Sequence, residues 1–229
     1  MKRFWRNAEV VEDGGFGIAL DGRRVKTPAR AELAVPTRGL AEAVADEWRE
    51  AGEQIDPRAM PLTGLANAAI DRVAPEAEAF AAGLAKYGET DLLCYRADSP
   101  AVLAERQEQE WGPLLAWARR RYDVDFCVTA STTYVPQPRE TVERLAHAVA
   151  ALDPFRLAGL SPLVTIGGSL VAALAVAEQA AAAEDAWQAV SLDERWQLEQ
   201  WGSDTEAEMA LANRRSDFLA AAKFLSLLD

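Results

Sequence analysis

Short apolar runs separated by turn signals fill the first 36 residues of the chain. Residues 16–20 alternate between apolar and small side chains, and the pairs Asp13-Gly14 and Asp21-Gly22 stand on either side of them. Aspartate–glycine pairs between short apolar runs are typical of β-hairpins, because glycine tolerates the positive φ of the turn. The pattern predicts a small antiparallel sheet over residues 1–36.

Apolar positions at helical spacing replace this alternation after residue 36. Leu40, Val44 and Trp48 form the buried stripe of a helix that Thr37 caps and that ends near residue 51. Similar stripes predict further helices over most of the remaining chain, at residues 62–73, 75–87, 99–122, 141–152, 157–177, 192–201 and 205–228.

One stretch between these helices has the alternation of a strand. Apolar and polar side chains alternate over residues 124–128, which predicts a short strand or hairpin ending at Pro136. Gly88 and the stretch that follows it mark a domain boundary. The predicted fold class is therefore α+β, with a small N-terminal domain of antiparallel sheet and helices (residues 1–88) and a larger all-α C-terminal domain (residues 89–229).

The charge balance restricts the kinds of partner. The 229 residues include 24 Lys and Arg against 36 Asp and Glu, which gives a net charge of −12. Nucleic acids and anionic membrane surfaces are bound mainly through Lys and Arg. We therefore expect no nucleic-acid partner and no docking on an anionic membrane.

An uncharged stretch at residues 157–177 is long enough to span a bilayer. It contains Pro162 and three glycines, and Arg156 and Glu178 flank it as ordinary helix ends. We predict a buried central helix and no membrane insertion. The N-terminus has neither a signal-peptide apolar run nor an Arg- and Ser-rich presequence. We expect a bacterial cytoplasmic protein, or a mitochondrial matrix protein if a presequence is missing from this sequence.

Side chains that carry catalysis or bind metals are few and scattered. Cys94, Cys127 and the single histidine, His147, do not cluster, whereas a metal site needs three or four ligands together. The glycines near residue 15 lie between strands and not before a helix, which excludes a dinucleotide loop. We expect no catalytic residue, cofactor, metal or small-molecule substrate. The enzyme alternative is a carboxylate-dependent, glycoside hydrolase-like protein, since acids and seven tryptophans are present.

Residues 184–208 concentrate acids around tryptophans. This C-terminal acidic segment contains eight Asp or Glu and one base, Arg195, together with Trp187, Trp196 and Trp201. Large rigid aromatics give contact area at low entropy cost in protein interfaces. Two interpretations are open. Either the tryptophans anchor helices while the acids face water, or the segment is a surface that binds another protein.

Motifs along nearly the whole chain occur together and in order. They are Lys2-Arg-Phe-Trp-Arg-Asn7, Leu20-Asp-Gly-Arg-Arg-Val-Lys-Thr-Pro28, Leu40-Ala41 with Glu47-Trp48, Met60-Pro-Leu-Thr63, Ala69-Ile-Asp71, Thr90-Asp-Leu-Leu-Cys-Tyr-Arg-Ala97, Gln109-Glu-Trp-Gly-Pro-Leu-Leu115, Gly159-Leu-Ser-Pro-Leu163 and the stretch 196–206. This ordered set resembles the assembly chaperones of the catalytic sector of ATP synthase that protect the free alpha subunit.

The resemblance implies an N-terminal α+β domain, a helical domain, no enzymatic activity and no nucleotide requirement. The implied role is to bind the unassembled alpha subunit and to shield its interface until the beta subunit takes the chaperone's place. By the same resemblance, the expected partner contacts, or supports of the contact surface, are Glu194, Trp196, Trp201, Asp204 and Glu206. We expect Asp91 and Arg96 to form a structural pair at the domain junction.

Overall fold

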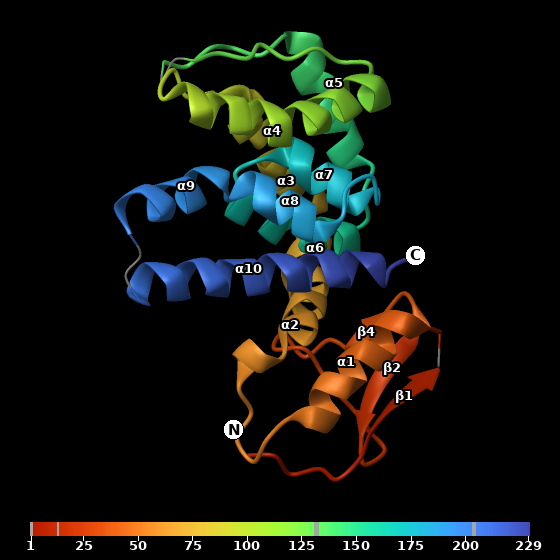
Figure 1. Ribbon diagram of the computed structural model, residues 1–229. Coiled ribbons are helices and arrows are strands. Elements are labelled where there is room, and N and C mark those ends of the chain that lie inside the picture. Colours follow the sequence, from red (N-terminus) through yellow and green to blue (C-terminus); the bar gives the residue numbers. More distant parts are fainter. Residues whose placement is uncertain (1, 13, 131–132, 203–204) are drawn as a thin grey trace. The chain divides into compact units, whose positions relative to one another are not determined.

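The computed structural model describes residues 2–12, 14–130, 133–202 and 205–229. It has the predicted α+β fold, with a small antiparallel sheet and helices followed by a helical region (Figure 1). The chain folds into two compact units. The first unit comprises residues 1–77, 153–159 and 223–229, and the second comprises residues 78–152 and 160–222. The division into domains 1–88 and 89–229 stays a prediction.

The sheet of the first unit is organised around one central strand. Its strands are β1 (Ala8–Glu12), β2 (Phe16–Leu20), β3 (Arg23–Arg24) and β4 (Ala34–Val35). Strand β2 pairs antiparallel with all three others, and Val10 of β1 lies opposite Ile18. The turn from β2 to β3 has positive φ at both Asp21 and Gly22, as a tight hairpin turn requires.

Helix α1 (Arg38–Glu50) packs against this sheet with its apolar stripe (Figure 1). Thr37 caps it as predicted, because its hydroxyl oxygen accepts the Leu40 N–H at 3.2 Å. Trp48 is only partly buried and packs edge-on against Trp5, with ring centroids 5.1 Å apart. Glu47 of the same helix caps the next one, α2 (Pro61–Ala68), by accepting two of its first backbone N–H groups.

The remaining helices follow the predicted order, with an additional helix at Ala183–Val190 that the sequence pattern did not predict. They are α3 (Ala77–Ala85), α4 (Ala101–Tyr122), α5 (Arg139–Ala150), α6 (Pro154–Gly167), α7 (Leu170–Ala177), α8 (Ala183–Val190), α9 (Leu192–Trp201) and α10 (Thr205–Ser226). Short 3₁₀ turns at 57–59, 74–76, 86–89 and 92–94 and a π-helical turn at 69–73 connect several of them.

The strand predicted at 124–128 is wrong. Residues 124–128 form no strand, and the nearest bridge is the parallel one between Tyr95 and Thr129, one residue beyond this stretch. Two buried side chains take the place of a neighbouring strand. The Gln137 amide exchanges two 2.9 Å hydrogen bonds with the backbone of Cys127, and the Thr141 hydroxyl donates to the Asp125 carbonyl at 2.6 Å. Polar side chains therefore satisfy the backbone that alternation alone assigns to a sheet.

The single helix predicted at 157–177 is also wrong, because the segment forms two helices. Gly168 has φ +67° and ends α6, and the Ser169 hydroxyl then caps α7 by accepting the Ala172 N–H at 3.0 Å. Helix α7 is buried from Leu170 to Val176, as expected of a central helix. No helix in the described ranges is both long and apolar enough to cross a membrane.

The predicted pair of Asp91 and Arg96 does not form. Asp91 is fully buried and accepts the N–H groups of Leu93 and Val171 at 3.1 and 2.9 Å, so it fixes the start of α7. Arg96 instead donates to the Gln107 carbonyl at 2.8 Å and lies over the Trp111 ring. A carboxylate that already caps two backbone segments needs no cation beside it.

Burial of Asp91 predicts a pH dependence of stability. Desolvation raises the pKa of this carboxyl from 3.8 to about 6, against the opposing effect of its hydrogen bonds. Because the folded-state pKa is the higher one, the contribution of Asp91 is fully present below pH 3.8 and is lost as the pH rises through 6. Between pH 4.5 and pH 7 the unfolding free energy of the wild type should therefore fall by about 2 kcal/mol more than that of the Asp91→Asn variant, which has no carboxyl group to titrate. Urea unfolding at the two pH values measures this difference.

The exposed Asp217→Asn provides the control, since it should leave the pH profile of the wild type unchanged. If the unfolding free energies of the wild type and Asp91→Asn changed with pH in the same way, the raised pKa of Asp91 would be contradicted.

Candidate functional site

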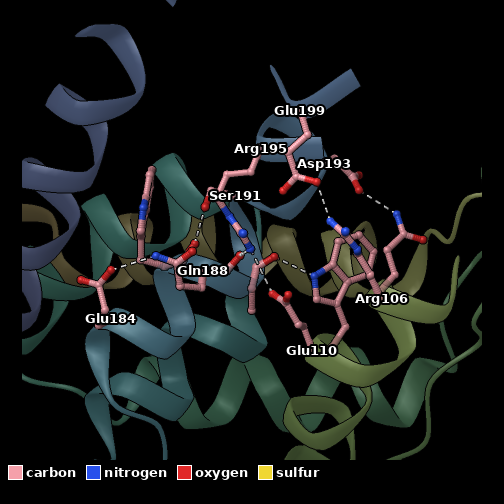
Figure 2. A network of polar contacts seen from close by, with 12 residues as sticks. Arg106, Glu110, Glu184, Gln188, Ser191, Asp193, Arg195 and Glu199 are labelled. Atoms are coloured by element: carbon pink, nitrogen blue, oxygen red, sulfur yellow. Dashed lines mark hydrogen bonds and ion pairs between the residues drawn. The ribbon is translucent and has the colours of Figure 1, made fainter. Parts of the chain in front are cut away.

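Helix α9 is held in place by its connection to α8 and by the long helix α4. The Trp111 side chain of α4 is fully buried, and its indole N–H donates to the Ala189 carbonyl at the end of α8 at 2.7 Å. Ser191, between α8 and α9, is also buried and donates its hydroxyl to the Trp187 carbonyl at 2.7 Å. The first bond ties the end of α8 to α4, and the second is local to the junction between α8 and α9 (Figure 2).

Polar side chains of α4 then pair with acids along α9. The Arg106 guanidinium lies 2.7 Å from Glu199, and the Gln107 amide donates to Asp193 at 2.8 Å. A third contact has the opposite polarity, since Arg195 of α9 lies 3.3 Å from Glu110 of α4. Figure 2 shows these contacts between α4 and α9. These contacts orient the acids of α9 and leave Trp201, at the end of the same helix, exposed.

Arginines of α10 pair with two further acids of the segment. Arg214 makes a two-pronged contact with Glu194, with nitrogen–oxygen distances of 2.8 and 2.6 Å. Arg215 contacts Glu184 in the same manner, at 3.1 and 2.5 Å. Hydrogen bonds from Arg215 and Gln188 lower the pKa of the Glu184 carboxyl. The segment's charge is thus partly neutralised by arginines distant in sequence, and these acids support the structure.

A groove of about 420 Å³ lies beside α9 in the second unit. Its apolar lining comes from the loop before α4, from α4 and from α9, through Tyr95, Pro100, Leu103, Trp196 and Trp201. Trp201 is 80% exposed at the end of α9, although tryptophan is usually well buried. Trp196 lies under Arg106, whose guanidinium carbon is 4.8 Å from the ring centroid.

The structure brings together only part of the predicted site. Trp196 and Trp201 line the same groove. Glu194 contacts α10, and Glu206 is exposed in the first turn of α10. Asp204 lies outside the described residues. That these residues contact a partner stays a prediction.

Sequence reasoning missed the contribution of α4 and of the loop before it. Pro100 and Leu103 form a wall of the groove, and Arg106 fixes both Trp196 and the acid at 199. These residues lie far from α9 in the sequence. The sequence around them shows only that Leu103 and Gln107 have helical spacing. This spacing indicates that one face of the helix is packed, but not which element packs against it.

Groups capable of nucleophilic or metal chemistry lie apart from this groove. Cys94 is buried, and desolvation raises the pKa of its thiol to about 12, so the thiol stays protonated. Cys127 and His147 are exposed on other segments. Among the residues that the structure describes, no three His, Cys, Asp or Glu side chains cluster closely enough to hold a metal ion.

Comparisons with known proteins identify the family. The sequence model of the ATP12 chaperone protein matches residues 2–119, which is just over half of the chain. The chain belongs to the ATP12 chaperone family. Atp12 from Paracoccus denitrificans, whose crystal structure is known, is 42% identical in sequence, and the two structures superpose with a TM-score of 0.94. The match includes the whole of this chain and 98% of the Paracoccus denitrificans chain.

Two further relatives extend the likeness. A mutant of the Paracoccus denitrificans protein is 41% identical with the same TM-score, and it too matches the whole of this chain and 98% of its own. The mitochondrial protein atp12 of Schizosaccharomyces pombe is 26% identical over 98% of this chain and 82% of its own length. The likeness to these ATP12 proteins includes the second unit, and so covers the α9 groove.

Charge reversal at two acids separates structural from exposed positions. Glu194→Lys breaks the contact with Arg214 and places two cations together, so we expect a loss of about 1 kcal/mol, the scale of partly exposed pairs. Glu206 has no ion-pair partner within the described ranges, and Glu206→Lys should stay within about 0.5 kcal/mol of the wild type. Urea unfolding measures both.

Adding Arg214→Glu to Glu194→Lys should recover most of the loss, because the pair is restored with its charges exchanged. An equal effect of the two single charge reversals would show that the contact with Arg214 contributes nothing.

Proposed function

We propose that this protein is an assembly chaperone for ATP synthase that binds the unassembled alpha subunit. In this proposal it covers the subunit's interface until the beta subunit replaces it. The observation that carries the proposal is the whole-chain likeness to ATP12 chaperones, with a TM-score of 0.94 to one of them. The motif set of the sequence, which spans residues 2–206, supports the same family role.

The groove beside α9 has properties that suit the task of covering an exposed subunit interface. A subunit taken out of an alternating ring exposes a large apolar interface, and such a surface is prone to aggregation. Trp196 and Trp201, beside Leu103, offer an apolar groove of a size that can accept protruding side chains. The ion pairs around it, such as Arg106 with Glu199, give it the polar rim that is usual in reversible interfaces. We propose this α9 groove as part of the client-binding surface.

Moderate affinity suits a protein that has to be displaced. An exposed tryptophan contributes strongly to an interface, while ion pairs at a wet rim contribute mostly to association rate and specificity. We therefore assign Trp201 and Trp196 the main contact, and Glu194, Asp204 and Glu206 the supporting polar role. We expect the protein to act where the catalytic sector is assembled, which is the cytoplasm of a bacterium or the matrix of a mitochondrion.

The carboxylate-enzyme alternative finds no support in the groove. Glycoside hydrolysis uses two carboxyl groups that face each other across the substrate. Within the described residues, Asp193 is the one carboxylate among the groove's lining side chains, and it accepts a hydrogen bond from Gln107. The neighbouring acids at 194 and 199 pair with arginines.

Capture of the alpha subunit tests the proposal. Tagged protein isolated from its native cells should carry the alpha subunit, and purified protein should suppress the light scattering of free alpha subunit. Trp201→Ser removes the exposed ring and should weaken capture by roughly tenfold or more, the scale of an interface hot spot. Tyr134→Ser, another exposed aromatic position, provides the matched control.

Recovery of other proteins and never of the alpha subunit would contradict the proposed function. Capture by Trp201→Ser as strong as that by the wild type would leave the function standing and would contradict only the proposed surface.

A further inference from the structure

A second hollow lies in the first unit, within the sheet-bearing part of the chain. Its volume is about 340 Å³, within the usual range of ligand pockets. Apolar side chains from four places in the sequence line it, namely Phe4, Leu20, Val25 and Trp48. We call it the N-terminal pocket. Neither the ATP12 likeness nor the α9 groove assigns it a role.

The apolar lining of the N-terminal pocket is fixed from behind. Leu20 is buried with Trp5, and Val25 and Trp48 pack against this cluster. The Trp5 indole N–H donates to the Trp48 carbonyl at 3.1 Å, which ties the end of α1 to the first residues of the chain. Phe4 by contrast is 70% exposed, with its ring edge-on to Trp5 at 5.2 Å. The pocket thus has a rigid floor and one exposed aromatic wall.

Three cations from one extended segment also line the N-terminal pocket, at Arg23, Arg24 and Lys26. Arg24 is paired with Glu32 at 2.7 Å. Arg23 and Lys26 are exposed and, within the ranges that the structure describes, have no ion-pair partner. No carboxylate is among the described lining residues.

This local charge is opposite to that of the whole protein. Residues 1–30 carry seven Lys or Arg and four Asp or Glu, whereas the full chain has a net charge of −12. Unpaired cations beside an apolar floor complement carboxylates that flank a large apolar side chain. Such charge complementarity guides partner choice and orientation.

We propose that the N-terminal pocket binds an acidic segment of a protein partner, which inserts one large apolar side chain between Phe4 and Trp48. The cations at 23 and 26 then contact carboxylates on either side of the inserted residue. A nucleic acid does not fit this description, because two free cations neutralise too few phosphates in a protein of this charge. The proposal goes beyond the proposed function and does not depend on which protein supplies the segment.

Peptide binding to the full-length protein tests this. The probe is a fluorescent seven-residue peptide with one phenylalanine between glutamates, and fluorescence anisotropy measures its binding at low and high salt. We expect saturable binding that weakens with salt, because exposed charges are screened. The double variant Arg23→Glu with Lys26→Glu should weaken binding by roughly tenfold, as expected for reversing two exposed contacts.

Matched controls separate the pocket from general charge effects. Arg58→Glu with Arg72→Glu reverses two exposed charges elsewhere in the first unit and should leave binding unchanged. Phe4→Ser should weaken binding without changing charge, and a peptide with serine in place of phenylalanine should bind more weakly to the wild type. Circular dichroism confirms that each variant is folded.

Three outcomes would overturn the proposal. The first is the absence of saturable binding, and the second is equal binding by the wild type and the Arg23→Glu, Lys26→Glu variant. The third is self-association in sedimentation velocity that this variant abolishes, because the occupant would then be a second copy of this chain.

Discussion

The buried hydrogen bond from the Trp111 indole to the Ala189 carbonyl fixes the C-terminal surface on α4. The bond is 2.7 Å long, and Trp111 is fully buried. Leaving a buried donor or acceptor unpaired costs about 1–3 kcal/mol, so the two groups are strongly held together. Ala189 lies just before α9, and the bond therefore decides which side of α9 faces α4. Trp196 and Trp201 line the groove as a consequence of that placement.

Ion pairs refine this placement without dominating it. Arg106 with Glu199 and Arg214 with Glu194 join partly exposed side chains, and such pairs contribute about 0–1 kcal/mol each. Their main effect is to keep the acids close to α4 and α10, so that Trp201 stays uncovered. A surface built in this way combines a rigid apolar contact with a hydrated rim, which suits an interaction that has to be reversed.

Local signals in the sequence predicted most of the fold. Thr37 as a cap and α9 at 192–201 were both predictable, because each depends on neighbours within one or two turns. The strand expected at 124–128 failed because the side chains of Gln137 and Thr141 satisfy its backbone. The central helix failed as a single element because the residue after α6 adopts a positive φ.

The candidate site was predictable only in part, for a physical reason. The tryptophans of α9 stood out by their size and by the acids around them. The wall that completes the groove comes from Pro100 and Leu103, and the pairing of Arg106 with Glu199 joins positions 93 apart. Only tertiary packing brings such residues together, and the pattern of a single sequence does not show which distant residues will pack against each other.

Hydrogen exchange of this protein with and without free alpha subunit tests the central claim most directly. The claim is that the client is bound on the α9 face of the second unit. It predicts slower exchange of the backbone amides of α9 and of residues 97–103 in the complex, with α5 unchanged. A complex in which the α9 amides exchange as fast as in the free protein would contradict it.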